Sequence, residues 1–463
     1  MAELSVHSTA IPGLLVIDLP LHGDARGWFK ENWQRVKMTA LGLPDFGPVQ
    51  NNMSFNATAG STRGLHAEPW DKLISLAHGR IFGAWVDLRK GASFGTAVTL
   101  ELGTDKAVFV PRGVANGYQA LESDTVYSYL VNDHWSPEAR GSYTYLNLAD
   151  ETVAIQWPIP LADAEISAAD QAHPRLGDVV AMAPKRRVVV GASGQLGRAL
   201  LGLLPDAMPL QRPDFDVTDP ATFAGVPWSQ VGLIVNASAH TAVDAAESPD
   251  GRRDAWAVNV TGLGRLVEVA RRHRIPLVHV SSDYVYDGTV ESHTEDEPLS
   301  PLGVYGQTKA AGDALVATLP QHWIVRTSWV IGEGNNFVRT MASLAERGIS
   351  PSVVNDQFGR LTFTADLAAG IVHLVSTDAP AGTYNLTNGG PSMSWADIAQ
   401  RVFELKGRSP SDVTGVTTAE YFAGKTMAPR PVHSRLDLTK LTAVGFTPPD
   451  AEDRLIEYLS QST

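Results

Sequence analysis

The sequence of 463 residues contains no cysteine. Disulfides, thiolate nucleophiles, cysteine-ligated zinc and iron–sulfur clusters are therefore excluded as sources of stability or chemistry. Basic residues are also in the minority, because 37 Lys and Arg stand against 50 Asp and Glu, a formal net charge of −13. A nucleic-acid-binding protein normally shows the opposite balance, so we expect no nucleic-acid partner. An anionic ligand would need arginines and lysines placed locally around it.

Long hydrophobic runs are missing as well. The longest apolar stretches, such as 188–190 and 233–235, are far shorter than the ~20 residues that cross a membrane. The first residues, Met-Ala-Glu-Leu-Ser, show no basic segment followed by an apolar one. We therefore expect no membrane contact and a cytoplasmic protein. With 44% hydrophobic and 19% charged residues, the composition is that of a globular chain with two or three domains.

Two different patterns follow each other along the chain. Up to about residue 160, short apolar stretches alternate with Gly/Pro turns, which predicts an all-β sandwich or barrel. From Arg186 onward, apolar strands alternate with helical segments, which predicts βαβ units and a parallel sheet. The expected strands lie at 14–17, 73–76, 81–86, 107–110, 188–190, 233–236 and 277–280, and the expected helices at 196–201 and 263–273. The stretch 174–185, with two prolines and one glycine, is typical of a linker, so we predict domains at 1–180 and 185–463.

A glycine-rich turn follows the first strand of the second half and opens a helix. Its spacing over 191–197 is G-x-x-G-x-x-G. Glycines let the backbone approach a pyrophosphate, and the helix N-terminus supplies free N–H groups and positive potential. A purely structural turn can also carry three glycines, but the position at the first βα turn of a new domain favours a dinucleotide site.

A second motif places Tyr305 and Lys309 four residues apart, on one face of a predicted helix. A tyrosine, with its ordinary pKa near 10, donates a proton poorly at neutral pH unless a nearby cation stabilises its anion. Ser282, at the end of an upstream strand, can hydrogen-bond a substrate carbonyl. Any single Y-x-x-x-K is more often a surface helix, but the glycine turn, Ser, Tyr and Lys in this order indicate a short-chain reductase.

On these motifs, residues 186–463 resemble dTDP-4-dehydrorhamnose reductase, an extended short-chain dehydrogenase with an α/β Rossmann fold. Further matching stretches lie at 215–219, 235–244, 282–288, 326–329, 336–338, 356–359 and 430–431. The sequence departs from the family at Arg360-Leu361, where a small residue and proline are usual. The resemblance implies that NADPH, or NADH, reduces C4 of a 4-keto sugar nucleotide. Tyr305 would protonate the alkoxide, Lys309 would lower the pKa of that tyrosine, and Ser282 would orient the carbonyl.

The same resemblance implies a set of cofactor-binding residues. Arg212 either meets a 2′-phosphate, which would favour NADPH, or is a solvated loop arginine, and Asp216 would lie against the adenine or ribose. The full set is Gly191, Ser193, Gly194, Gln195, Leu196, Gly197, Arg212, Asp216, Ala237, Ser238, Ala239, Tyr305 and Lys309.

In the first half, His66 stands in an Arg-Gly-Leu-His stretch, with Lys72 six residues further on. A histidine beside a lysine in the mouth of a β-barrel can bind metal, bind phosphate or act as a base. The other histidines of this half show no H-x-H pattern with a later ligand, so we predict no metal site; they are His7, His22, His78, His134 and His173.

Residues 11–177 resemble dTDP-4-dehydrorhamnose 3,5-epimerase, a cupin-type jelly roll without metal. The matching stretches lie at 24–31, 50–54, 63–66, 86–89, 111–113, 135–138 and 167–170. The resemblance implies that His66 is the general base, that Asp170 orients it, that Lys72 stabilises the enolate oxygen and that Tyr129 is the acid on the opposite face. Arg26 and Arg63 would hold the diphosphate and Trp135 would stack on the thymine. The implied substrate-binding residues are Arg26, Glu31, Gln50, Asn52, Arg63 and Trp135.

The two resemblances together imply a bifunctional enzyme that converts dTDP-4-dehydro-6-deoxy-D-glucose to dTDP-L-rhamnose. One family histidine is replaced by Asn116, which leaves open a mono-epimerase with a 4-ketoreductase in another deoxysugar pathway. A regulatory subunit that binds NADP without turnover is a further alternative, although Ser282, Tyr305 and Lys309 are all present. We also expect a homodimer through the N-terminal domain, with Trp135 either reaching the neighbouring subunit's ligand or packing on its own barrel.

Overall fold

The computed structural model describes residues 3–377, 379–424 and 427–461. The chain divides into two compact units, Met1–Pro184 and Lys185–Thr463, each with hydrophobic cores of its own. Within the described segments, no helix is both long enough and apolar enough to cross a membrane.

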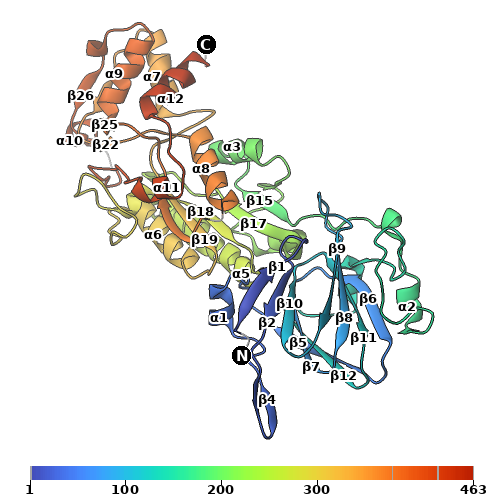
Figure 1. Cartoon of the computed structure of the whole chain (residues 1–463). Coiled ribbons are helices and arrows are strands. Elements are labelled where there is room, and N and C mark those ends of the chain that lie inside the picture. The colour runs from blue at the N-terminus through green and yellow to red at the C-terminus, as the bar shows by residue number, and fades with distance from the viewer. Residues whose placement is uncertain (1–2, 378, 425–426, 462–463) are drawn as a thin grey trace. The chain divides into compact units, whose positions relative to one another are not determined.

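The first unit is built mainly from antiparallel strands (Figure 1). Its strands are β1 (Ser5–Ser8), β2 (Leu15–Asp18), β3 (His22–Asp24), β4 (Gly27–Phe29), β5 (Gln50–Asn56), β6 (Ser61–Ala67), β7 (Lys72–His78), β8 (Ile81–Asp87), β9 (Ala97–Leu102), β10 (Lys106–Val110), β11 (Val114–Ala120), β12 (Thr125–Val131), β13 (Thr144–Tyr145) and β14 (Glu165–Ile166). Its helical segments are α1 (Arg35–Ala40), η1 (Glu138–Ser142), α2 (Ala168–Gln171) and η2 (Leu176–Asp178). One sheet has the order β1-β2-β10-β7-β12-β5, and the other has the order β13-β6-β11-β8-β9, with β14 added to β6.

The core of this unit lies between the two sheets. Ile74 and Val108 from the first sheet pack with Trp85 and Tyr118 from the second. Alternate residues of each strand enter this layer, because successive side chains of a strand point to opposite faces. The four apolar stretches predicted as strands lie in β2, β7, β8 and β10, and the predicted all-β fold of this half is confirmed.

The stretch 174–185 packs on the first unit rather than forming a loose linker. Met182 is buried and forms an isolated β-bridge with Arg89. Its backbone N–H donates to the carbonyl of Leu88 over 2.8 Å. Two further residues of this stretch, Leu176 and Val179, pack against the same core. The first unit therefore extends a few residues past the predicted end at residue 180.

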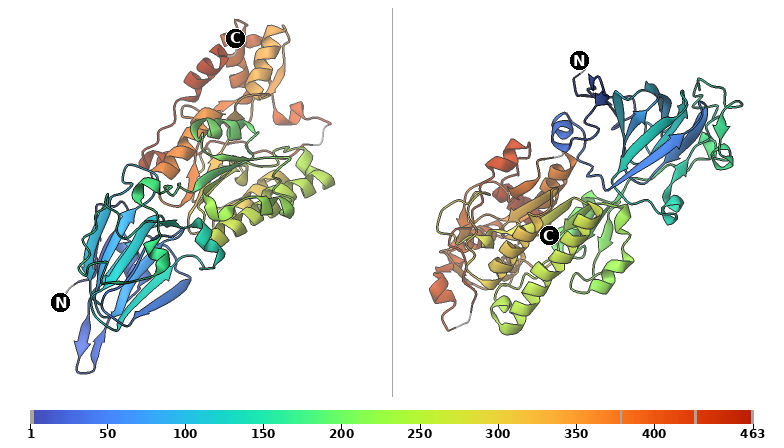
Figure 2. Two further views of the ribbon diagram at one scale, coloured as in Figure 1. Left: turned by 90° about the vertical axis from the view of Figure 1, so that its right-hand side faces the viewer. Right: turned by 90° about the horizontal axis from the view of Figure 1, so that it is seen from below.

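A two-stranded hairpin, formed by β3 and β4, projects from the sheets of the first unit (Figure 1 and Figure 2). Trp28 and Phe29 are both exposed on it. Exposed aromatic side chains on a projecting element are typical of a surface that binds another molecule.

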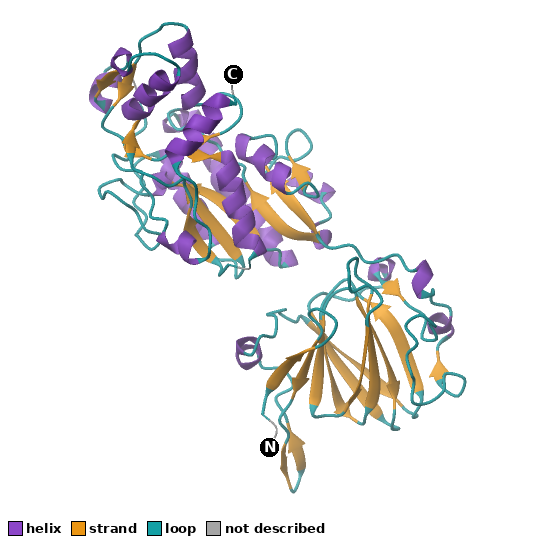
Figure 3. Ribbon diagram, turned by 45° about the horizontal axis from the view of Figure 1, so that its top comes forward, coloured by secondary structure: helices purple, strands orange, loops and turns teal. Residues whose placement is uncertain are grey.

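The second unit has a parallel six-stranded sheet with helices on both faces (Figure 3). Its strands are β15 (Arg186–Val190), β16 (Met208–Leu210), β17 (Val231–Asn236), β18 (Leu277–Ser282), β19 (His322–Thr327) and β24 (Gly382–Asn385), in the order β16-β15-β17-β18-β19-β24. The helical segments beside the sheet include α3 (Gln195–Leu203), α4 (Pro249–Trp256), η6 (Ala257–Gly262), α5 (Leu263–His273), η7 (Asp283–Val285), α6 (Val304–Val316), α8 (Thr364–Ser376) and α11 (Thr439–Ala443). The predicted Rossmann architecture is confirmed.

Both faces of the parallel sheet are buried, which explains its continuous runs of apolar residues. Val189 of β15 packs in a cluster with Leu200 of α3 and Ile371 of α8. Its neighbour Val188 packs in the opposite cluster with Leu266 of α5. All carboxyl ends of the strands meet at one edge, where the glycine turn and Ser282 lie.

A smaller layer of helices and short strands completes the second unit. It consists of β20 (Val330–Ile331), α7 (Phe337–Glu346), β21 (Ser352–Val354), β22 (Phe358–Gly359), β23 (Thr362–Phe363), β25 (Met393–Ser394), α9 (Trp395–Leu405), β26 (Thr414–Val416), α10 (Thr418–Tyr421) and α12 (Ala451–Ser460). It has a separate core around Phe403 and Val338.

Candidate active sites

The first unit contains a cavity of about 950 Å³. It collects residues from β6, β7, β11 and β12 together with η1 and α2. The sequence-predicted residues in its wall are Arg63, His66, Lys72, Tyr129, Trp135 and Asp170. Residues that the sequence reasoning missed as part of this site are Glu68, Arg140, Tyr143, Tyr145 and His173.

His66 and Asp170 form a hydrogen-bonded pair in this cavity. His66 lies on β6, and its Nε2 is 2.8 Å from Oδ1 of Asp170. Ser167 caps α2 by accepting from the Asp170 backbone N–H, which fixes the start of that short helix. Burial, the largest single influence, raises the pKa of Asp170, but the bond and charge of His66, the Gly64 N–H and His173 together lower it. Asp170 is thus held as a carboxylate beside the imidazole.

A second histidine joins this pair, so the prediction that the histidines of this half do not gather is wrong for His173. Its Nε2 lies 3.9 Å from Oδ1 of Asp170, and its ring is 5.2 Å from that of His66. Burial and the nearby His66 lower the pKa of His173. One ligand atom from each of the three residues lies within 4.8 Å of the others, a spacing that can hold a cation. The i,i+3 spacing of Asp170 and His173 was the available signal in the sequence.

Lys72 forms a buried ion pair, which the sequence reasoning did not foresee. Its Nζ lies 2.5 Å from Oε1 of Glu68, whose Oε2 accepts a 2.5 Å bond from Trp70 Nε1. The same ammonium lies 5.6 Å from the ring centroid of Tyr129. Lys72 therefore lies in the wall of the cavity, as predicted, but the carboxylate of Glu68 compensates its positive charge.

Tyr129 faces the cavity from β12. Burial and the Glu68 carboxylate raise its pKa to about 12. Tyr143 lies edge-on to Trp70 at 5.5 Å, and burial together with Glu68 raises its pKa also. Both phenols therefore keep their protons at neutral pH.

The predicted binding residues divide into two groups. Arg63 and Trp135 line the cavity. The Nε of Arg63 donates to Oδ1 of Asn56 over 3.2 Å. The side chain of Trp135 lies beside Arg140, and the residue is 44% exposed. Gln50 and Asn52 lie on β5 outside the described wall, where the Gln50 Nε2 donates to Asn52 Oδ1 over 2.7 Å.

Arg26 and Glu31 are not brought to this cavity. The Arg26 side chain is 89% exposed on the β3–β4 hairpin and pairs with Asp24, and Glu31 pairs with Lys37 at 2.7 Å. Because the hairpin projects away from the sheets, Arg26 does not join Arg63 in the cavity of its own chain, and its expected contact with the diphosphate stays a prediction.

Asn116 occupies the position of the missing family histidine and is part of the cavity wall. Its Nδ2 donates to the Tyr127 hydroxyl over 3.0 Å. Its Oδ1 is buried and has no hydrogen-bond partner among the described residues. An unpartnered buried oxygen is a free acceptor for a ligand.

In the second unit, the glycine turn is a tight backbone cradle. Gly191 has a φ of +79°, and a Cβ there would lie 2.8 Å from the backbone of Ser238. A Cβ on Gly197 would lie 2.3 Å from the carbonyl of Gly191. Gly194 caps α3 without a side chain, so the first N–H groups of the helix stay available. The residues present fit the pyrophosphate of a dinucleotide.

The remaining predicted cofactor residues surround this cradle at the carboxyl edge of the sheet. Ser193, Gln195 and Leu196 belong to the same turn and helix, and 237–239 follow directly after β17. Arg212 is exposed after β16, and Asp216 accepts from the backbone N–H of Thr218 over 2.8 Å.

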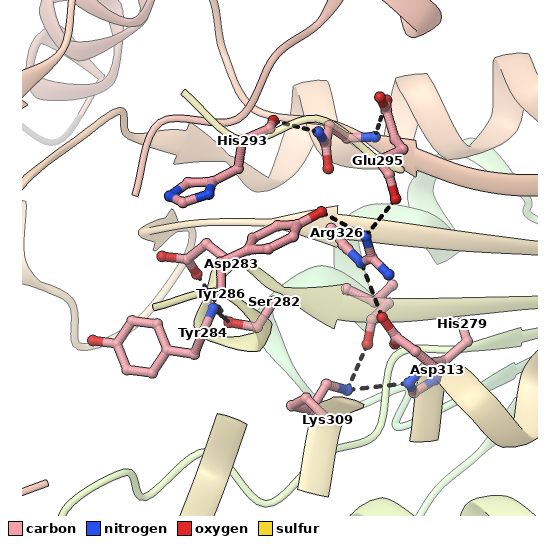
Figure 4. Close-up of polar contacts among 12 residues, drawn as sticks. His279, Ser282, Asp283, Tyr284, Tyr286, His293, Glu295, Lys309, Asp313 and Arg326 are labelled. Carbon is pink, nitrogen blue, oxygen red and sulfur yellow. Dashed lines mark hydrogen bonds and ion pairs between the residues drawn. The ribbon is translucent and has the colours of Figure 1, made fainter. Parts of the chain in front are cut away.

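Ser282 lies beside the buried carboxyl group of Asp283 (Figure 4) and also contacts the phenol of Tyr305. The Ser282 hydroxyl donates to Oδ1 of Asp283 over 2.9 Å. Burial and Asp283 raise the pKa of Tyr305 to about 12, and a hydrogen bond with Ser282 acts against them. Burial also raises the pKa of Asp283, to about 6. Asp283 was quoted in the family motif, but its role beside Ser282 was not predicted.

Lys309 is buried on α6 and bonds to β18. Its Nζ donates to the carbonyl of Val280 over 2.7 Å and lies 3.2 Å from Nε2 of His279 (Figure 4). Burial lowers the pKa of Lys309 to about 8. At Tyr305, burial and Asp283 raise the pKa in the chain by itself. The lowering of that pKa by Lys309 stays a prediction.

These two sites define two classes of enzyme. A cavity with a histidine–carboxylate pair, a lysine and a protonated phenol is suited to moving protons at carbon next to a ketone. A parallel sheet with a glycine cradle and a Ser, Tyr and Lys at its carboxyl edge is a short-chain reductase.

Comparison with known families agrees with both classes. Residues 185–463 match the family described as RmlD substrate binding domain, and residues 8–178 match the family dTDP-4-dehydrorhamnose 3,5-epimerase. The chain belongs to both families, one in each unit, and joins an epimerase with a reductase.

Individual relatives support each half separately. Protein RmlC homolog of Streptococcus pyogenes serotype M6 is 51% identical over 180 residues, which are 38% of this chain and 90% of the relative. The dTDP-4-dehydrorhamnose reductase of Aggregatibacter actinomycetemcomitans is 39% identical over 285 residues, which are 57% of this chain and 95% of the relative. Among solved structures, the dTDP-4-dehydrorhamnose reductase of Bacillus anthracis in complex with NADP has a TM-score of 0.56 and 33% identity, and the match covers 60% of this chain and 100% of that one.

Proposed function

We propose that this chain catalyses two consecutive steps of dTDP-L-rhamnose synthesis. The first unit inverts C3 and C5 of dTDP-4-dehydro-6-deoxy-D-glucose, and the second reduces the C4 ketone of the product with NADPH. The observation that supports this most is the presence of a complete set of proton-transferring groups in each unit: His66–Asp170 with Tyr129, and Ser282 with Tyr305.

In the epimerase, His66 removes the proton on the carbon next to the ketone. Asp170 holds the imidazole in place and stabilises its charged form. Lys72 offers its positive charge to the enolate oxygen, with Glu68 keeping the buried ammonium compensated. Tyr129, which keeps its proton because its pKa is about 12, returns a proton to the carbon from the other side.

In the reductase, the Ser282 hydroxyl, which donates to Oδ1 of Asp283 in the free chain, turns its proton to the C4 carbonyl of the substrate and orients it. The reduced nicotinamide supplies the hydride when it is bound. Tyr305 donates its proton to the developing alkoxide, and Asp283 holds the hydroxyl of Ser282 in place until the substrate binds. The cofactor's pyrophosphate would lie on the cradle of Gly191, Gly194 and Gly197.

The choice of cofactor and the cellular location are also part of this proposal. Arg212, exposed at the end of the second strand, is free to meet a 2′-phosphate, so we propose NADPH in preference to NADH. We place the enzyme in the cytoplasm, because nucleotide sugars and reduced nicotinamide cofactors are found there.

We further propose a homodimer through the first unit. Met53 and Phe55 are exposed on β5, an edge strand of its sheet, and Trp28 and Phe29 are exposed on the hairpin. Pairing would cover this apolar edge. Because Arg26 does not line the cavity of its own chain, a partner's cavity is a place where it could contact substrate.

The test is to incubate the full chain with dTDP-4-dehydro-6-deoxy-D-glucose and NADPH and to identify the sugar product. We expect dTDP-L-rhamnose, with one NADPH oxidised per sugar. A product inverted at only one carbon would indicate the mono-epimerase alternative, and NADPH binding without oxidation would indicate a regulatory subunit.

A further inference from the structure

The second unit contains a cavity of about 500 Å³ that the proposed reductase chemistry does not use. Arg360 and Arg435 supply the positive charge of its wall, and Asp437 contributes a carboxylate. Helix α11 adds Thr439 and Thr442 to the same wall. The catalytic serine, tyrosine and lysine proposed above are not part of it.

The segment 433–437 separates this cavity from the catalytic residues. It is extended and forms two β-bridges with neighbouring segments. Successive side chains of an extended segment point to opposite faces. Leu436 is buried in one cluster with Tyr286, which directly follows η7, so Arg435 and Asp437 point to the other face, where the cavity lies. The cavity and the catalytic serine before η7 therefore lie on opposite faces of this segment.

Arg360 is held rigidly at this cavity and keeps one donor free. It lies between β22 and β23 and is only 6% exposed. Its Nη2 donates to the carbonyl of Leu436, and its own backbone carbonyl accepts from the Ser328 hydroxyl over 3.1 Å. Its Nε is buried and has no hydrogen-bond partner among the described residues. Because a guanidinium has donors and no acceptor, this N–H needs an oxygen from a molecule other than the chain itself.

The charges around this donor favour an anion. Arg435 is exposed, and its side chain makes no hydrogen bond or ion pair with the described residues. Burial and the nearby Arg435 lower the pKa of Arg360 to about 10, so both arginines are charged at neutral pH. Asp437 and Asp450 act on this pKa in the opposite direction, but each of their carboxylates is already bonded to a backbone N–H over 2.8 Å. An incoming anion would relieve the repulsion between the two cations.

We propose that the cavity between Arg360 and Arg435 is an anion-binding site of the second unit that takes a phosphate group, either as the free ion or as a phosphate ester. Planar guanidinium groups match the oxygens of phosphate, which accept several hydrogen bonds at once. The volume of the cavity is in the range of sites for small organic ligands. Arg360 stands where the related reductases usually have a small residue, so the site is a property of this sequence and is independent of the reductase chemistry.

Equilibrium dialysis of the full chain against ³²P-labelled inorganic phosphate tests the site directly. We expect one phosphate per chain to bind through Arg435, so that its dissociation constant rises about tenfold or more in Arg435→Gln, as for the loss of a charged hydrogen bond. This arginine is exposed, so its substitution does not disturb the core. Arg347→Gln removes an equal charge from an exposed arginine after α7, outside the cavity, and should leave binding unchanged. Identical binding curves for the unmodified chain, Arg435→Gln and Arg347→Gln would overturn the proposal.

A second variant tests the buried donor. Arg360→Lys keeps the positive charge but has no Nε, so phosphate should again bind about tenfold more weakly, with folding checked by the thermal unfolding transition. Unchanged phosphate binding in folded Arg360→Lys would overturn the assignment of this nitrogen to the site.

Competition identifies the source of the phosphate group. Unlabelled phosphate and AMP are compared as competitors for the labelled phosphate whose binding depends on Arg435. Stronger displacement by AMP supports a site for a phosphate ester, whose organic part fills the rest of the cavity. Displacement by AMP that is no stronger than that by phosphate supports a site for the free ion.

Discussion

Single residues carry the epimerase chemistry, and His66 is the most exacting of them. As the proposed base it depends on Asp170, which holds its ring through the 2.8 Å bond. We expect His66→Ala to slow solvent deuterium exchange at C3 and C5 by about 10²- to 10⁴-fold, while pre-epimerised substrate is still reduced. His78→Ala, which changes an exposed histidine at the end of β7, is the matched control. Unchanged exchange in His66→Ala would exclude this histidine as the base.

The two phenols Tyr129 and Tyr305 are the proposed proton donors of the two units, and burial keeps both of them protonated. Tyr305→Phe removes only the proton donor, so kcat for reduction should fall about 10²- to 10⁴-fold with the NADPH dissociation constant unchanged. Stopped-flow oxidation of NADPH measures the first quantity and fluorescence titration the second. Tyr384→Phe, whose hydroxyl bonds the carbonyl of Pro380 away from Ser282, should leave both unchanged.

Among the elements, those defined by local sequence could be predicted and those defined by distant contacts could not. The glycine turn before α3 and the Tyr305–Lys309 pair on α6 follow from spacings within one or two turns of chain. The bond between His66 and Asp170 joins residues 104 positions apart and was reached only through a family resemblance.

Charge compensation and side-chain direction were the parts that the sequence could not specify. Glu68 pairs with Lys72, and His279 reaches Lys309, because β-strands and turns bring them together in the buried interior. The exposed position of Arg26, away from the cavity of its own chain, could not be predicted either, because the sequence does not tell in which direction a hairpin projects from its sheet.

Helix α2 brings Asp170 next to both His66 and His173, and this raises the question of a metal. Oδ1 of Asp170 already accepts the bond from His66, and proton removal needs a free imidazole lone pair. Treatment with EDTA followed by gel filtration should therefore leave the rate of epimerisation unchanged. Loss of activity that returns with added Zn²⁺ or another divalent ion would place the first unit among metal-dependent cupins.

At the scale of the whole molecule, the two units should be separable. The cut belongs between Pro184 and Lys185, because Met182 is buried in the first unit and β15 begins at Arg186. We expect the fragment 185–463 to fold and to bind NADPH as tightly as the full chain, measured by fluorescence titration. A cut after residue 180 should destabilise the epimerase fragment, since it removes Met182. An aggregated reductase fragment without NADPH binding would contradict the boundary.

The assembly decides whether Arg26 has a function at all. On its own chain this arginine projects into solvent, so in a monomer Arg26→Ala should change nothing. In the proposed homodimer it enters the partner's cavity, and Arg26→Ala should raise the KM of the epimerase about tenfold or more, as expected for the loss of a charged hydrogen bond to phosphate.

Mixing subunits that carry different substitutions distinguishes a monomer from a homodimer in which Arg26 acts in the partner's cavity. A heterodimer of one His66→Ala chain and one Arg26→Ala chain contains one cavity with both residues intact only if Arg26 acts across the interface. At substrate concentrations below KM, an equal mixture, in which about half of the dimers are heterodimers, should then regain about a quarter of the native activity. Light scattering at micromolar concentration should give twice the mass of the chain. A monomer with full epimerase activity, or a mixture that stays as inactive as its components, would refute the exchange.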